Sequence, residues 1–76
     1  MFVDASALTA ILTDETDAAA LAARLQRALR RVTSPLAVWE TGVAVARHLD
    51  LPVPAAREAV HAYLDLAGIE ILAVPP

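Results

Sequence analysis

Three short apolar segments, at residues 1–4, 32–33 and 69–74, are each separated from the next by two helical patterns. The segments are rich in Phe, Val and Ile, which favour strands. They do not alternate apolar with polar residues, so both faces of each strand should be buried, as in a parallel sheet covered by helices. The order β-α-α-β-α-α-β therefore predicts a three-layer α/β/α fold with a short parallel sheet.

A capping residue predicts the start of the first helix, and charged residues predict the two ends of the second. Ser6 is predicted to cap a helix that ends at Leu12, because its hydroxyl can accept a bond from an amide of the first turn. Asp4 then lies at the corner between the first strand and this helix. A second helix is predicted from Thr13 or Asp14 to about Arg31, with acidic residues in its first turns and Arg in its last, which suits the helix dipole.

The third and fourth helices have stronger signals. Ser34 followed by proline predicts an N-cap for a helix over residues 35–49. This helix is apolar on several faces, including Leu36 and Trp39, which is typical of a helix packed on two sides. The prolines in 52–54 end it and start a fourth helix, for which Gly68 is the expected C-terminal cap.

The chain is short and carries no disulfide. It has 76 residues and no cysteine, and a core of this size contributes only about 3 to 5 kcal/mol, so a partner chain, a metal or further residues are expected to add stability. A parallel sheet is rarely left at three strands with bare edges. We therefore expect residues 1–76 to form a single truncated domain, incomplete at the C-terminus, that associates as a homodimer or with a bound partner.

The charged residues bear on nucleic-acid binding, secretion and membrane insertion. The net charge of −3 argues against non-specific binding to nucleic acid. The N-terminus carries Asp4 where a signal peptide needs positive charge, and charged residues interrupt every apolar stretch before it reaches membrane-spanning length. These features predict a soluble, cytoplasmic chain.

Two carboxylates are predicted to approach each other at one edge of the sheet. Asp4 ends the first strand, and Glu40 lies in the second turn of the helix that follows the second strand. The carboxyl ends of parallel strands meet at one edge, where α/β folds usually bind ligands. The alternatives are that Asp4 only caps the first helix and that Glu40 reaches solvent or pairs with Arg47.

Two stretches carry a family resemblance. MFVDASALTAIL (1–12) and TSPLAVWETGVAVAR (33–47) resemble the opening of a PIN-domain ribonuclease of the VapC toxin type, in which the first strand ends in Asp followed by a small residue and Ser. That family also places a Glu one turn into the helix after the second strand. PAAREAVHAYLDLAG and IEILAV resemble the segments that follow, so the resemblance covers the whole chain.

The resemblance implies a site and its partners. It assigns Asp4 and Glu40 as the catalytic carboxylates that bind Mg²⁺ or Mn²⁺, with the Ser6 hydroxyl beside them. It also implies an RNA substrate and a cognate antitoxin protein in the cytoplasm. The family completes its site with further acids after the third strand, and Asp65 and Glu70 are poor substitutes for them. We therefore expect negligible RNA cleavage by the 76-residue chain.

Two other functions stay open. The chain can be a non-catalytic toxin fragment that dimerises or binds an antitoxin, or a small α/β interaction module unrelated to nucleases. Arg24, Arg27 and Arg31 are spaced as one helical stripe, with Arg30 nearby. This stripe either contacts RNA phosphates or is a solvated face near a helix C-terminus.

Overall fold

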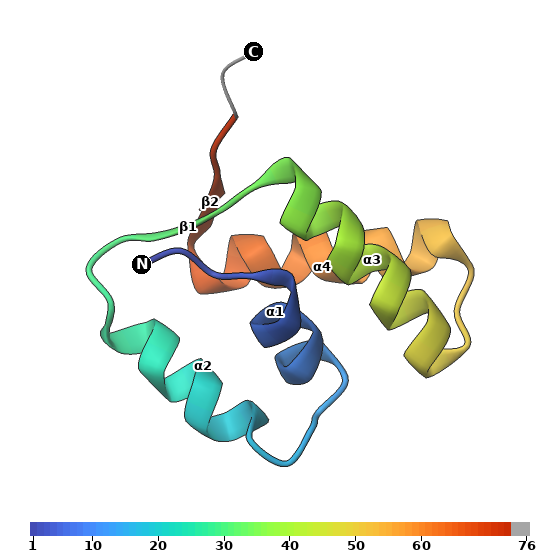
Figure 1. The fold of residues 1–76 in the computed structure, drawn as a ribbon, viewed down its shortest axis with the longest axis horizontal. Coiled ribbons are helices and arrows are strands. Elements are labelled where there is room, and N and C mark those ends of the chain that lie inside the picture. Colours follow the sequence, from blue (N-terminus) through green and yellow to red (C-terminus); the bar gives the residue numbers. More distant parts are fainter. Residues whose placement is uncertain (74–76) are drawn as a thin grey trace.

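Four helices and two short strands make up the computed structural model, which describes residues 1–73 (Figure 1). The elements in chain order are α1 (Ala5–Leu12), α2 (Ala18–Arg27), β1 (Arg31–Thr33), α3 (Pro35–Leu49), α4 (Val53–Ala67) and β2 (Ile69–Ile71). The helix α3 packs between α1 and α4, and α2 packs against α1. The predicted α/β class with a parallel sheet is confirmed.

The strand β1 lies in the middle of the sheet region. On one side it pairs in parallel with β2, with Val32 opposite Glu70. On the other side it meets the N-terminal segment through a parallel bridge between Phe2 and Val32. Backbone bonds run from Val32 N–H to Met1 O (2.9 Å) and from Val3 N–H to Val32 O (2.7 Å). All three segments therefore run in the same direction.

The first and third predicted strands are shorter than expected. Residues 1–4 form a bridge instead of a strand, because Asp4 already caps α1 and only the residues before it can pair. The third strand covers Ile69–Ile71, and one further bond from Leu72 N–H to Thr33 O (2.9 Å) extends the contact. The predicted part from residue 74 onward lies outside the described residues.

The N-cap of α1 is Asp4, and the prediction of Ser6 was wrong. The Asp4 carboxylate accepts a hydrogen bond from Ala7 N–H at 2.9 Å. Pairing with β1 ends at Val3, so Asp4 is the last extended residue and its side chain reaches the unpaired amides of the first turn. Ser6 is already helical, and its hydroxyl donates to the Asp4 carboxylate.

The second helix is shorter than predicted at both ends. It begins only at Ala18. The reason is that Asp14 adopts a left-handed conformation (φ 54°), which cannot belong to a right-handed helix. In this turn Glu15 N–H donates to Ala10 O at 2.9 Å. The helix ends at Arg27, and the extended backbone of Ala28 (ψ 136°) turns the chain toward β1.

The predicted limits of α3 are confirmed, but two of its large apolar residues are exposed. Ser34 accepts a bond from Ala37 N–H at 3.1 Å, and the helix runs to Leu49. Two helices, α1 and α4, pack against it, so the prediction that it packs on two sides is confirmed. Leu36 and Trp39, which the sequence counted among its apolar residues, are each 63% exposed and lie outside this packing.

The core lies where α1, α3 and α4 meet below the strands. Leu8, Val45, Val60 and Leu64 are at most 2% exposed, and burial of such a side chain stabilises the fold by about 1.5 to 3 kcal/mol. Gly42 of α3 lies against α4, where an added Cβ would stand 3.4 Å from Arg57 Cγ, an ordinary van der Waals contact. The remaining apolar members of the cluster are Val3, Leu25, Ala46, Ala56, Ala67 and Ile69.

Some large apolar residues lie outside this core. Leu29 and Leu66 are almost fully exposed, at 105% and 84%. Homodimer formation, which could cover such residues, stays a prediction.

Within residues 1–73, no helix combines the length and the apolar character that crossing a bilayer needs.

Two helix C-caps have left-handed backbone, and we expect mutations at them to change stability in opposite directions. Gly68 has φ 66° and Asp50 has φ 52°. We expect Gly68→Ala to lower the free energy of unfolding by about 1 kcal/mol, because a Cβ is strained in this conformation. We expect Asp50→Gly to raise it by about 0.5 kcal/mol, by relief of the same strain. Urea unfolding measures both, and changes of the same sign would contradict this account.

Candidate functional site

Asp4 holds its carboxylate at the N-terminus of α1. The preceding residue, Val3, is 3% exposed and anchored to β1, whereas Asp4 itself is exposed. Oδ1 of Asp4 accepts two hydrogen bonds, from Ala7 N–H and from the Ser6 hydroxyl, both at 2.9 Å. The side chain is therefore fixed in direction and open to solvent.

These bonds keep Asp4 ionised. The Ala7 N–H, and after it the Ser6 hydroxyl, lower the pKa of Asp4 below its ordinary value of 3.8. Both groups stabilise the charged form more than burial disfavours it. Asp4 is therefore an anion at neutral pH.

Glu40 faces the first turn of α1 across a shallow depression. It is exposed on α3, and Ser6 and Thr9 of α1 line the same depression of about 350 Å³. Ser6 is thus a neighbour of both predicted carboxylates, through a hydrogen bond to Asp4 and across this depression from Glu40. The alternative ion pair with Arg47 is not formed, because within residues 1–73 the structure has one salt bridge, between Arg30 and Glu70.

A second, larger depression lies between the N-terminal segment, α1 and α2. We call it the α1–α2 groove; its volume is about 460 Å³. Asp4 and Ser6 belong to its lining, and Asp17 and Arg24 add further charges. Its apolar lining consists of Met1, Phe2, Val3, Ala7, Ala10, Leu21 and Leu25. The groove is therefore apolar with charged groups of both signs.

Glu15 also belongs to this region, although its sequence pattern does not predict it there. Glu15 lines both depressions together with Ser6. Its charge predicts a place in the first turns of a helix, whereas it lies in the loop that connects α1 with α2. The acidic run from Asp14 to Asp17 was the signal available, because such polar runs often mark a connection between helices.

The chemistry of these side chains fits a divalent cation with few protein ligands. Among residues 1–73, no three His, Cys, Asp or Glu side chains are grouped closely enough to hold a metal ion. Mg²⁺ needs only one or two carboxylates when water and substrate phosphates complete its shell. Asp4 and Glu40 are exposed oxygen donors of the right class, and Asp4 is charged.

The predicted arginine stripe does not exist as one surface. Arg31 lies outside α2 and donates from Nη1 to Leu25 O at 3.0 Å and to Ala28 O at 3.4 Å, so it caps the end of that helix. Arg30 pairs with Glu70 across the strands at 3.1 Å. The stripe was wrong because the spacing assumed a helix continuing to residue 31.

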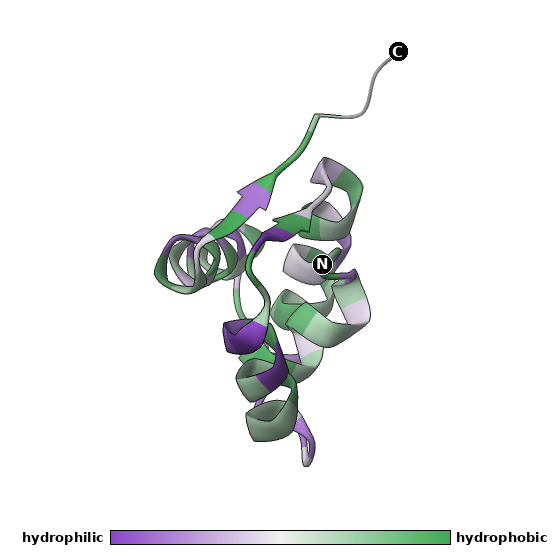
Figure 2. Ribbon diagram, turned by 90° about the vertical axis from the view of Figure 1, so that its left-hand side faces the viewer, coloured by the Kyte–Doolittle hydropathy of each residue, from purple (hydrophilic) through white to green (hydrophobic). Residues whose placement is uncertain are grey.

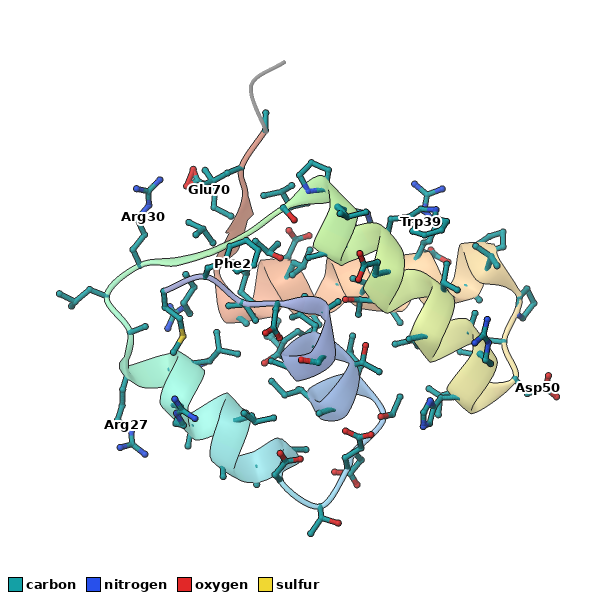
Figure 3. All side chains as sticks on the ribbon, in the orientation of Figure 1. Phe2, Arg27, Arg30, Trp39, Asp50 and Glu70 are labelled. Carbon is teal, nitrogen blue, oxygen red and sulfur yellow. The ribbon has the colours of Figure 1, made fainter. Side chains whose placement is uncertain are left out.

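Two basic side chains stay exposed on α2, Arg24 and Arg27. Figure 2 shows the end of α2 that carries them as strongly hydrophilic. Arg24 also lines the α1–α2 groove, whereas Arg27 points away from the body of the protein (Figure 3). Of the predicted stripe, only Arg24 is close to the candidate site.

Comparison with known proteins identifies one family. A family model described as the PIN domain matches residues 1–76. No curated protein matches the chain.

The hydrogen bonds to Asp4 predict how stability depends on pH. Its pKa is lower in the folded state, so its contribution is present above the unfolded value of 3.8 and is lost as the pH falls through the folded value. Asp4→Asn keeps a capping side chain but cannot titrate. We expect the stability advantage of the wild type over Asp4→Asn to shrink between about pH 6 and about pH 3.

Urea unfolding at the two pH values measures this difference. Asp65→Asn, on the exposed side of α4, controls for the loss of one carboxylate elsewhere. If the difference in free energy of unfolding between the wild type and Asp4→Asn does not change with pH, the two hydrogen bonds do not have the proposed effect on the pKa of Asp4.

Proposed function

The chain belongs to the PIN domain family, a family of nucleases that act on RNA, and on this premise we propose that it is a metal-dependent endoribonuclease of a toxin–antitoxin system. Asp4 and Glu40 are the proposed catalytic carboxylates. The observation that supports this assignment is their common neighbour: Ser6 is bonded to Asp4 and shares a depression with Glu40.

Each of the three residues has a separate task. Asp4 supplies a charged oxygen at neutral pH, because its two hydrogen bonds lower its pKa. Ser6 holds the direction of that carboxylate through its bond to Oδ1. Glu40 supplies the second carboxylate from α3, and its exposure leaves it accessible to a phosphate backbone.

When bound, Mg²⁺ or Mn²⁺ supplies Lewis-acid activation of water and stabilises the charge that develops on the phosphate. Two protein carboxylates place the water less precisely than a full ligand set does, and a misplacement of about 1 Å can cost roughly 10²-fold in rate. We therefore expect the 76-residue chain to bind the ion weakly and to cleave RNA negligibly.

Metal binding tests the two carboxylates without requiring catalysis. We expect Mn²⁺ to broaden the NMR signals of residues 5–7 and of the turn around Glu40 in the wild-type chain. Asp4→Asn and Glu40→Gln should each weaken this binding by about tenfold or more, since even partners in the second coordination shell contribute about 10- to 100-fold. Asp65→Asn and Glu58→Gln, both exposed on α4, are the matched controls and should bind as the wild type does.

Cleavage is measured on an extended chain that supplies further acidic residues after residue 76, because the 76-residue chain itself is expected to cleave RNA negligibly. RNA cleavage that requires Mg²⁺, stops with EDTA and is lost in Asp4→Asn or Glu40→Gln would support the proposal. Full activity in Asp4→Asn, with an unchanged circular dichroism spectrum, would refute it.

The α1–α2 groove favours a second role, the binding of a cognate antitoxin peptide. Phe2 is 57% exposed although it lines this groove, so its ring is available to a partner. Three acids, Asp4, Glu15 and Asp17, lie along the lining against one Arg24. This lining suits a segment with apolar side chains and an arginine or lysine.

A peptide with one apolar helical face and a central arginine tests this role. We expect Phe2→Ser to weaken its binding by about tenfold, which corresponds to about 1.4 kcal/mol. Leu66→Ser removes another exposed apolar side chain, on α4 and away from the groove, and should leave binding unchanged. Equal effects of the two variants in fluorescence anisotropy would exclude the groove as the binding surface.

A further inference from the structure

Thr33, the last residue of β1, has a fully buried hydroxyl that contacts the backbone next to the candidate site. Its side chain is 0% exposed, and Oγ1 donates to Val3 O at 2.7 Å. Val3 directly precedes Asp4 in the chain. The bond therefore joins the end of β1 to the peptide from which Asp4 departs.

The Thr33 hydroxyl takes the place of the next backbone hydrogen bond between the N-terminal segment and β1. The ladder is made of Val32 N–H to Met1 O and Val3 N–H to Val32 O. The next bond of a parallel ladder would run from Ser34 N–H to Val3 O, and among residues 1–73 the backbone does not form it. Ser34 has left the sheet to cap α3, so the hydroxyl of the residue before it bonds the carbonyl instead.

Thr33 contacts the start of α1, which carries Asp4, and directly precedes the N-cap of α3, which carries Glu40. Its side chain holds the carbonyl before Asp4, and its backbone leads directly into Ser34, the N-cap of the helix that bears Glu40. Thr33 O also accepts from Leu72 N–H at 2.9 Å, which anchors the residue from the side of β2. A shift of Thr33 would therefore move the starts of α1 and α3 relative to each other.

We infer that Thr33 is a positioning residue of the site, and that its hydroxyl sets the direction of Asp4 through the Val3–Asp4 peptide. This inference rests on the proposed function, because it matters for catalysis only if Asp4 binds the ion. Thr33 itself does not touch the ion or the substrate. It acts on Asp4 as an outer-shell partner acts on a metal ligand.

The chain offers a matched control for this role. Thr41 is also 0% exposed, and its Oγ1 also donates over 2.7 Å, but to Ala37 O within its own helix. Thr33→Val and Thr41→Val each remove one buried hydroxyl at nearly constant volume. Only Thr33→Val removes a bond that joins β1 to the residue before Asp4.

We expect Thr33→Val to weaken Mn²⁺ binding by about tenfold and to speed hydrogen exchange of the Ala7 amide relative to that of Ala37. These two amides donate to the capping side chains of Asp4 and Ser34 respectively, so their ratio reports the Asp4 corner specifically. Thr33→Ser keeps the hydroxyl and should restore both readouts. Thr41→Val should leave both near wild type.

Equal effects of Thr33→Val and Thr41→Val on both readouts would overturn the inference. A wild-type chain without Mn²⁺ broadening near Asp4 would refute the proposed function instead, while the exchange ratio would still decide whether Thr33 holds the Asp4 corner. If Thr33→Val does not fold, Thr33→Cys replaces it, because its thiol is a weaker donor of similar size and should give an intermediate ratio.

Discussion

Parallel pairing on both sides of β1 is the constraint on which the rest of the structure depends. Val32 bonds to the N-terminal segment through both its N–H and its carbonyl, and β2 pairs on the other side. Because the segments run in the same direction, α1 and α3 both start at the same edge of the sheet. Asp4 and Glu40 are distant in sequence, and this topology places the helices that carry them side by side.

Local chemistry made part of the fold predictable from sequence. Ser34 before a proline and Gly68 after a helix each satisfy backbone groups that no distant residue supplies, so the limits of α3 and the end of α4 were correct. The cap of α1 was different, since Asp4 and Ser6 are both good capping residues. Pairing of Val3 with β1 decided between them, and a sequence pattern does not contain that contact.

The errors at the site have a related cause. The arginine stripe and the place of Glu15 both depended on one long second helix, which the left-handed turn at Asp14 and the extended Ala28 shorten at its two ends. Spacing along a helix predicts neighbours only while the helix continues. Asp4 and Glu40 were predicted from the order of strands and from the family resemblance, neither of which depends on the limits of the second helix.

Capping and metal binding are compatible tasks for Asp4. Both hydrogen bonds from the first turn of α1 go to Oδ1, and a carboxylate has further lone pairs on its second oxygen. The same bonds lower the pKa of Asp4, so they maintain the negative charge that a divalent cation requires. They also restrict the rotation of the side chain, which reduces the entropy lost when it binds an ion. The simpler interpretation of Asp4 as a helix cap therefore supports its proposed role in catalysis instead of competing with it.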